Sequence, residues 1–262
     1  LIVTGILARP FFVKWRRNRL KNFRISPIWQ AIITEKITIY DCLSPDERKR
    51  LRGHLQVFLR EKQFIGCRGL QITEEIKITI GAIACLLLLN ERGSYFSQLR
   101  SILVYPSTYL VHEKSYKGNY VVEENSSARL GESWTNDQLV LSWEQIQEDT
   151  RNWQDGHNVI LHEFAHQLDQ EDRKAEGVPI LPKHIDYAIW AQVMTQEYQQ
   201  LCLDVERGIK TVIDSYGATN PAEFFAVATE TFFEKPHQLQ KKHPALYQLL
   251  QQYYQLNPLE WV

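Results

Sequence analysis

Apolar positions recur at helical spacing in several stretches of the chain, and some of these stretches begin at recognisable start signals. Residues 44–47 read SPDE, which is typical of a capping box with proline at the first helical position, and predict a helix to about Lys62. Its apolar stripe consists of Leu51, Leu55, Phe58 and Leu59. Residues 73–90 end in a nearly unbroken apolar run that is too short to span a bilayer, so we expect a helix buried within the domain.

The middle of the chain has the shorter apolar runs of strands. Residues 101–105 are closed by Pro106, residues 109–112 form a second candidate, and residues 138–143 follow a turn-like segment at 135–137. The run at 138–143 shortly precedes a histidine motif. One hypothesis makes it an edge strand that receives a substrate peptide through main-chain hydrogen bonds, using Val140, Leu141, Ser142 and Trp143. The alternative is a strand of the core sheet.

Helical patterns return in the second half. One helix is predicted from just after residues 155–156 to about Gln170, and a long one from about Ile185 to Gly208. A further helix opens at Asn220, a good N-cap, with Pro221 in its first position; we expect it to be the last. The pattern predicts a helix-rich α+β fold with a small sheet beside the histidine motif.

The histidine motif is HExxH, formed by His162, Glu163 and His166. On a helix the two histidines lie one turn apart on one face, so both rings can bind a single ion. Zinc suits such a pair, and a catalytic zinc commonly has three protein ligands and an open position for water. Glu163 has the place of a general base acting on that water. The alternative is a partly exposed helix without metal, but its apolar neighbours indicate a buried one.

A third ligand is expected downstream of His166. The candidates include His184, Asp204, Glu206, Asp214, Glu223 and Glu230. Glu223 follows the N-cap Asn220 by three residues, so it could complete a capping box as readily as bind metal. Asp169 shares the face of the histidines and Glu230 shares the face of Glu223. Each is either a carboxylate that orients a ligand or a surface group.

Composition narrows the class of protein. The chain has 262 residues, an ordinary hydrophobic content of 44% and a net charge of −1, which gives no reason to expect a nucleic-acid partner. Four scattered cysteines without a C-x-x-C pair fit a reducing compartment, so we expect a cytoplasmic protein. We predict a single domain over residues 26–262, with a helical part to about residue 100 and a catalytic part from 101 to 262.

Residues 1–25 form a separate segment with an apolar start. The basic residues that follow are those that flank the cytoplasmic side of membrane helices: Lys14, Arg16, Arg17, Arg19 and Lys21. One hypothesis is that the segment is the end of a membrane anchor, which would attach the protein to the inner face of the membrane. The other is a hydrophobic terminus joined to a solvated basic helix.

Several motifs together resemble the Mlc titration factor A family of bacterial zinc peptidases, which are M90-type gluzincins. They are HEFAHQLD at 162–169, LSW at 141–143, GESW at 131–134, and DSY at 214–216 with NPAE at 220–223. The resemblance runs from about Leu43 to Pro258. Residues 215–226 are also similar to the catalytic domain of anthrax lethal factor. The apolar start and basic flank are expected to have no counterpart in the enterobacterial members.

The resemblance implies a zincin-like fold and further roles. It makes Glu223 the third zinc ligand and places the phenol of Tyr216 where it helps to hold the oxyanion. It also implies a regulatory association with a transcriptional repressor, whose identity we do not carry over. We therefore predict a peptidase with one Zn²⁺, an aminopeptidase being one form of the activity. The alternative is an interaction protein that sequesters a transcriptional regulator and has weak peptidase activity.

Overall fold

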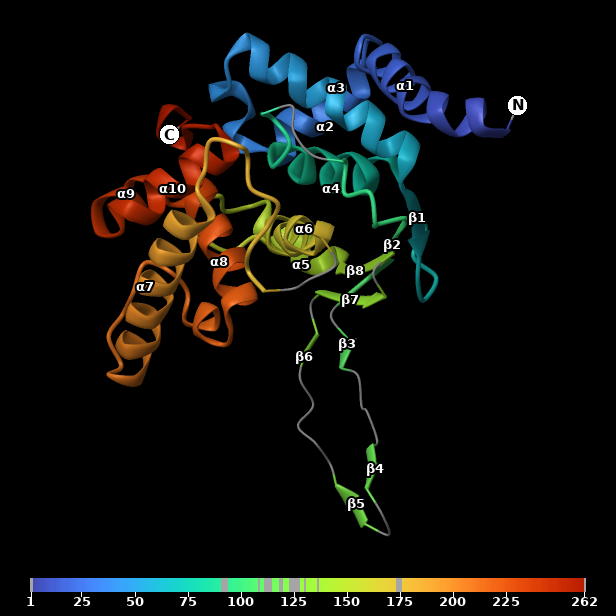
Figure 1. Ribbon diagram of the computed structural model, residues 1–262. Coiled ribbons are helices and arrows are strands. Elements are labelled where there is room, and N and C mark those ends of the chain that lie inside the picture. The colour runs from blue at the N-terminus through green and yellow to red at the C-terminus, as the bar shows by residue number, and fades with distance from the viewer. Residues whose placement is uncertain are drawn as a thin grey trace.

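The computed structural model describes the backbone of residues 2–90, 94–107, 109–110, 115–117, 120–122, 128–129, 131–135, 137–172 and 176–261. Side chains are described for residues 11–90, 94–107, 137–172 and 176–261. Helices surround a small sheet (Figure 1), which confirms the helix-rich α+β class.

Four helices form the N-terminal part: α1 (Ile2–Lys21), α2 (Pro27–Lys36), α3 (Pro45–Glu61) and α4 (Glu74–Leu86). The capping box predicted for α3 is present, because Ser44 accepts from Glu47 N while the Glu47 side chain accepts from Ser44 N. Helix α4 is buried along almost its whole length, as its apolar sequence predicts. Among the described residues, no helix combines the length and the apolar character needed to cross a membrane.

The main sheet has the strand order β1-β2-β8-β7. Strands β1 (Gln63–Gly66), β2 (Ser101–Tyr105) and β8 (Gln138–Ser142) are parallel, and β7 (Gly131–Thr135) runs antiparallel to β8. The edge-strand hypothesis for residues 138–143 is therefore wrong. Strand β8 is hydrogen-bonded on both sides, Val140, Leu141 and Ser142 are buried, and Trp143 already belongs to the next helix. The edge strand beside β8 is β7, which the apolar pattern did not predict.

Two short antiparallel ladders lie between β2 and β7 in the sequence. Strand β3 (Tyr109–Leu110) pairs with β6 (Ala128–Arg129), and β4 (Ser115–Lys117) pairs with β5 (Tyr120–Val122). The start of the strand predicted at 109–112 is thus confirmed, and its last two residues lie outside the described residues.

Six helices follow β8: α5 (Trp143–Asp149), α6 (Val159–Asp169), α7 (Tyr187–Glu206), α8 (Pro221–Glu234), α9 (Pro236–Lys242) and α10 (Pro244–Tyr254). Helix α6 carries the histidine motif and packs against α4 and α8. Helices α9 and α10 follow α8, so the expectation that α8 is the last helix is wrong. Each of these two begins with proline, which cannot continue the preceding helix and starts a new one readily.

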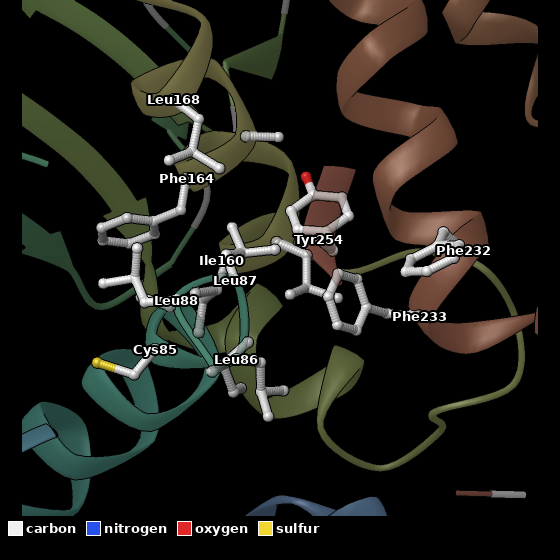
Figure 2. Packing of buried hydrophobic residues seen from close by; sticks show 14 of the residues in the cluster. Cys85, Leu86, Leu87, Leu88, Ile160, Phe164, Leu168, Phe232, Phe233 and Tyr254 are labelled. Carbon is white, nitrogen blue, oxygen red and sulfur yellow. The ribbon is translucent and has the colours of Figure 1, made fainter. Parts of the chain in front are cut away.

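The hydrophobic core forms around α6. Figure 2 shows Ile160, Phe164 and Leu168 of α6 near side chains of α4 and α8, with Tyr254 of α10 completing the packing. The buried cluster includes residues from Ile33 to Trp261, and the division of the chain into residues 1–25 and a single domain over 26–262 stays a prediction. Because the apolar face of α6 is held from several sides, its histidine face has a defined direction.

Candidate metal centre

Helix α6 presents His162 and His166 on one face. Asn158 caps its start, since the side-chain oxygen accepts from Leu161 N at 3.2 Å. The buried residues Ile160, Leu161 and Phe164 occupy the remaining faces, as the sequence predicts. The Nε2 atoms of the two histidines lie 3.2 Å apart.

Helix α8 brings Glu223 to these histidines. Asn220 caps the helix by accepting from Glu223 N at 3.0 Å, and Pro221 occupies its first turn. The side chain of Glu223 reaches across to α6, where its Oε2 lies 3.0 Å from His162 Nε2 and 3.3 Å from His166 Nε2. Of the two readings of Glu223 from sequence, this geometry favours the metal ligand over the capping box.

The three ligand atoms fit a single zinc ion. Ligands about 2.0–2.1 Å from a tetrahedral zinc lie about 3.3 Å from one another. The atoms of His162, His166 and Glu223 all lie within 4.8 Å of one another, with closest contacts of 3.0–3.3 Å. Among the side chains that the structure describes, this is the one group of three with a metal-binding arrangement. Of the other candidates for the third ligand, none belongs to it.

Glu230 lies directly behind His162. Its Oε1 accepts from His162 Nδ1 at 2.6 Å, and its Oε2 accepts from Asn158 N at 2.6 Å. In the neutral ring, with the Nδ1 proton directed to Glu230, the lone pair of Nε2 is available to a metal ion in the cluster. This is the contact expected of a carboxylate that orients a metal ligand.

The charges of the cluster are strongly coupled in the protein without metal. Burial acts to lower the pKa of His162, but the hydrogen bonds to Glu223 and Glu230 outweigh it and raise that pKa to about 10. Burial acts to raise the pKa of Glu223, but the two histidines lower it to about 2. Without metal the cluster therefore binds a proton, which a metal ion at the same place would displace.

Glu163 is the buried carboxylate of the motif, with 7% of its surface exposed. Burial raises its pKa; the histidines act in the opposite sense, while Glu223 and Glu230 raise it further. A carboxylate whose pKa is raised toward neutrality is suited to accept a proton and to return it.

Tyr216 lies on the short 3-10 helix η3 (Ser215–Ala218), directly before α8. Asp214 fixes the turn by accepting from Tyr216 N at 2.7 Å. The phenol ring lies 6.0 Å from the His162 ring, centroid to centroid, and is 54% exposed. Burial of part of the ring, together with Glu223 and Glu163, raises its pKa, so the hydroxyl keeps its proton and can donate it in a hydrogen bond.

Asp169 is buried, so it is not a surface group, and its role in orienting a ligand stays a prediction. Its described hydrogen bonds go to the loop that follows α6, where Gly177 N donates to Oδ2 at 2.9 Å, and none of them reaches His166. Gly177 has φ +74°, and a Cβ there would lie 2.3 Å from the carbonyl oxygen of Pro221. Asp169 thus holds a loop that lies against the first turn of α8, near Glu223.

Two more buried carboxylates meet the start of α6, and sequence reasoning missed both. Asp149 Oδ2 accepts from Val159 N at 2.8 Å, and burial raises its pKa to about 6. Glu234 accepts from Gly156 N at 3.0 Å and from Asn158 Nδ2 at 3.1 Å, and burial raises its pKa to about 9. The spacing of Glu223, Glu230 and Glu234 along one face of α8 was the available signal for Glu234.

The sequence matches a family of known peptidases. The family model described as "Glucose-regulated metallo-peptidase M90" covers residues 12–255. Because this match begins at residue 12, the basic flank from Lys14 to Lys21 lies inside the shared region, contrary to the expectation that it has no counterpart. The narrower similarity to lethal factor stays a prediction.

Individual relatives align over nearly the full chain. The uncharacterized protein slr2042 of Synechocystis is 47% identical over 259 residues, which is 98% of this chain and 94% of the relative. Mlc titration factor A of Pectobacterium atrosepticum is 31% identical, covering 94% and 93%. The protein of that name from Klebsiella pneumoniae is 30% identical, covering 88% and 87%.

Proposed function

The chain belongs to the glucose-regulated metallopeptidase family M90, and we propose that it is a zinc-dependent peptidase. The observation that carries the proposal is the convergence of His162, His166 and Glu223 at distances suited to one tetrahedral ion. The buried base Glu163 lies on α6 between the two histidines, and the hydroxyl donor Tyr216 lies on η3, directly before the helix that carries Glu223.

Each side chain has one task in peptide hydrolysis. His162, His166 and Glu223 would hold a zinc ion, which would supply Lewis acidity toward the scissile carbonyl and toward a water molecule. Glu163 accepts the proton of the attacking water and later delivers it to the leaving amine. Tyr216 donates a hydrogen bond to the carbonyl oxygen as negative charge develops on it. Glu230 keeps His162 in the tautomer that this arrangement needs.

Strand β7 is the most suitable place for an extended substrate. Among the described strands it is the outer one of the main sheet, and it packs next to α6, so a peptide paired with its outer edge would lie near the motif helix. Main-chain pairing with such an edge holds a peptide whatever its side chains. This assignment replaces the one that sequence reasoning gave to residues 138–143.

Peptide cleavage that depends reversibly on metal tests the proposal. Purified protein is incubated with a mixed peptide library before chelation, after chelator treatment, and after zinc is restored. We expect cleavage in the first and third samples only, and the new termini will show whether the enzyme removes N-terminal residues or cuts internally. Cleavage that persists in protein shown to be free of metal would contradict the proposal.

A second function is favoured by the relatives whose printed name is Mlc titration factor A. That name indicates binding of a regulator called Mlc by those proteins, so we also propose that this chain binds a transcriptional regulator. The discriminating experiment compares the wild-type protein with Glu163→Gln in the host cell. Full cellular function of the Glu163→Gln protein would make regulator binding, and not hydrolysis, the primary role.

A cytoplasmic location is also proposed. All four cysteines, Cys42, Cys67, Cys85 and Cys202, are free thiols, which suits a reducing compartment. Membrane attachment through a segment preceding Leu1 stays a separate hypothesis, and recovery of the full gene product would test it.

A further inference from the structure

A hollow of about 440 Å³ lies in the N-terminal part, far along the sequence from the metal centre. It is formed by the end of α1, the link to α2, the first turn of α2 and one face of α3. Its lining residues are Lys21, Asn22, Phe23, Arg24, Ile25, Ser26, Pro27, Gln30, Lys49 and Arg52. We call this feature the basic hollow.

The basic hollow has a pronounced positive charge. Four of its ten lining residues are Lys or Arg, and none of the ten is acidic. The start of α2 adds the positive end of a helix dipole, with Ser26 as its N-cap and no acidic residue in its first turn. The hollow is therefore suited to an anionic group such as a phosphate.

Basic and acidic residues are also unevenly distributed along the whole chain. Residues 1–34 contain seven Lys or Arg and no Asp or Glu, although the whole chain has a net charge of −1. Residues 35–262 consequently carry 23 basic and 31 acidic residues. A positive surface at one end of an otherwise acidic protein orients the molecule toward a negative surface.

Large apolar side chains project into solvent beside these charges. Phe23, which lines the hollow, is 55% exposed, and Ile28, in the first turn of α2, is 64% exposed. The backbone at Phe23 is fixed, because its carbonyl accepts from Gln56 Nε2 at 2.7 Å. The fold thus holds an aromatic and an aliphatic side chain outward beside a cluster of cations.

The exposed side of α1 also combines large apolar side chains with basic ones. Phe11, Phe12 and Trp15 are all more than half exposed, and the Arg19 guanidinium lies 5.8 Å from the centre of the Trp15 ring. The inner side is fixed to α3 by the bidentate pair of Arg17 with Glu61, at 3.0 and 2.7 Å. Aromatic rings interleaved with Lys and Arg are typical of helices that lie in the headgroup region of a bilayer.

We propose that the basic hollow and its apolar rim form a docking surface for an anionic lipid bilayer. The hollow takes a phosphate-bearing headgroup, and Phe23 and Ile28 enter the boundary between headgroups and acyl chains. A bilayer satisfies both features at once, because it offers dense negative charge directly above hydrocarbon. The surface lies outside the metal centre, and this proposal does not depend on the proposed peptidase activity.

Vesicle flotation with the full chain tests the proposal. We expect the protein to float with phosphatidylcholine vesicles that contain 30% phosphatidylglycerol and not with pure phosphatidylcholine, and we expect 0.5 M NaCl to weaken the binding. In the double variant Arg24→Gln/Lys49→Gln, binding should fall about 30-fold. Each cation near an anionic surface contributes about 1 kcal/mol, and each 1.36 kcal/mol is a factor of ten.

A second variant separates the apolar contribution. Phe23→Ser/Ile28→Ser removes exposed hydrocarbon, so folding should be retained while vesicle binding falls about tenfold or more. The matched control is Lys210→Gln/Lys241→Gln, which removes the same charge from exposed sites elsewhere and should bind like wild type. All variants are first compared with wild type by thermal unfolding and zinc content.

Four results would overturn the proposal. They are equal flotation with neutral and anionic vesicles, unchanged binding of the Arg24→Gln/Lys49→Gln variant, and binding of glycerophosphate without flotation on anionic vesicles, which would indicate a soluble phosphate ligand. The fourth is binding to a polyglutamate peptide without binding to anionic vesicles, which would indicate an acidic protein partner.

Discussion

The hydrogen bond between Glu230 and His162 Nδ1 decides which ring nitrogen faces the metal cluster. At 2.6 Å it is short, and the second oxygen of the same carboxylate is committed to Asn158 N, also at 2.6 Å. Glu230 therefore links His162 to Asn158, which is the N-cap residue of the same helix. A change at this one side chain alters the orientation of a ligand without removing it.

Glu230→Gln is expected to lower zinc affinity about 10- to 100-fold. The amide has one acceptor oxygen where the carboxylate has two, so either His162 or Asn158 loses its partner. Competition with a chelating dye measures the zinc Kd, and Glu148→Gln, an exposed carboxylate of α5, is the matched control. An unchanged Kd would show that Glu230 does not orient the ligand.

Tyr216→Phe is expected to reduce kcat about 10²-fold or more while KM and zinc content stay close to wild type. The phenol hydroxyl is proposed to bond the substrate oxygen only as charge develops, so its loss affects the transition state more than the ground state. The ring is half exposed, so stability should change little. Steady-state kinetics on a peptide substrate provide the measurement, and an unaltered kcat would refute the role.

Some residues of the site can be predicted from the sequence alone, and others cannot. His162, Glu163 and His166 follow from helical spacing alone, because one element contains all three. Glu223 is 57 positions from His166, so spacing leaves its role open; the family resemblance makes it a ligand, and its contacts with both histidines support that proposal. The contact of Asp169 with Gly177 could not be predicted, because it depends on a loop whose path no helical pattern specifies.

At the scale of elements, the start of α6 is the most heavily supported point of the fold. Asp149, Glu230 and Glu234 accept from the backbone of residues 156, 158 and 159, and Asn158 caps Leu161 N. Carboxylates at a helix N-terminus interact favourably with its dipole. Burying Asp149 and Glu234 has a cost, however, which appears in the raised pKa values of these two carboxyl groups.

Asp149 makes this cost measurable as a pH dependence. Burial raises its pKa to about 6 from an ordinary value of 3.8. Its contribution to stability is therefore fully present below pH 4 and is lost as the pH rises through 6. By linkage the loss amounts to at most about 3 kcal/mol, since each unit of pKa corresponds to 1.36 kcal/mol. Asp149→Asn removes the ionisable group, so the free energy of unfolding of this variant should not fall in this way as the pH rises through 6.

Urea unfolding of metal-free protein at pH 4.5 and pH 7.5 checks the prediction. Relative to wild type, Asp149→Asn should be more stable at pH 7.5 than at pH 4.5. Metal is removed because a bound cation would lower the pKa values of nearby carboxylates. The same difference in stability at both pH values would show that Asp149 does not titrate in this range.

The elements predicted best are those with chemical start signals. The capping box of α3 and the Asn-Pro start of α8 were identified from a few residues, because their hydrogen bonds are local. The order of the strands in the sheet has no such local signal in the sequence. An edge strand and a central strand can have the same apolar pattern, so β8 was assigned to the edge and β7 was missed.

At the scale of the molecule, two chemically distinct regions share one fold. The metal centre lies where α6 and α8 cross, supported by a core that extends from α2 to the C-terminal residues. The basic hollow is lined by residues of α1, α2, α3 and the link between α1 and α2. If both proposals hold, peptides would be cleaved by an enzyme held at the surface of an anionic bilayer.

The separation of metal binding from turnover tests the central claim most directly. Glu163→Gln and His166→Ala are compared with wild type for zinc per chain and for the rate of peptide cleavage, with Glu148→Gln as the control. The account predicts one zinc in wild type, in Glu163→Gln and in the control, loss of zinc in His166→Ala, and turnover only in wild type and the control. A Glu163→Gln protein that binds zinc and cleaves peptides at the wild-type rate would contradict it.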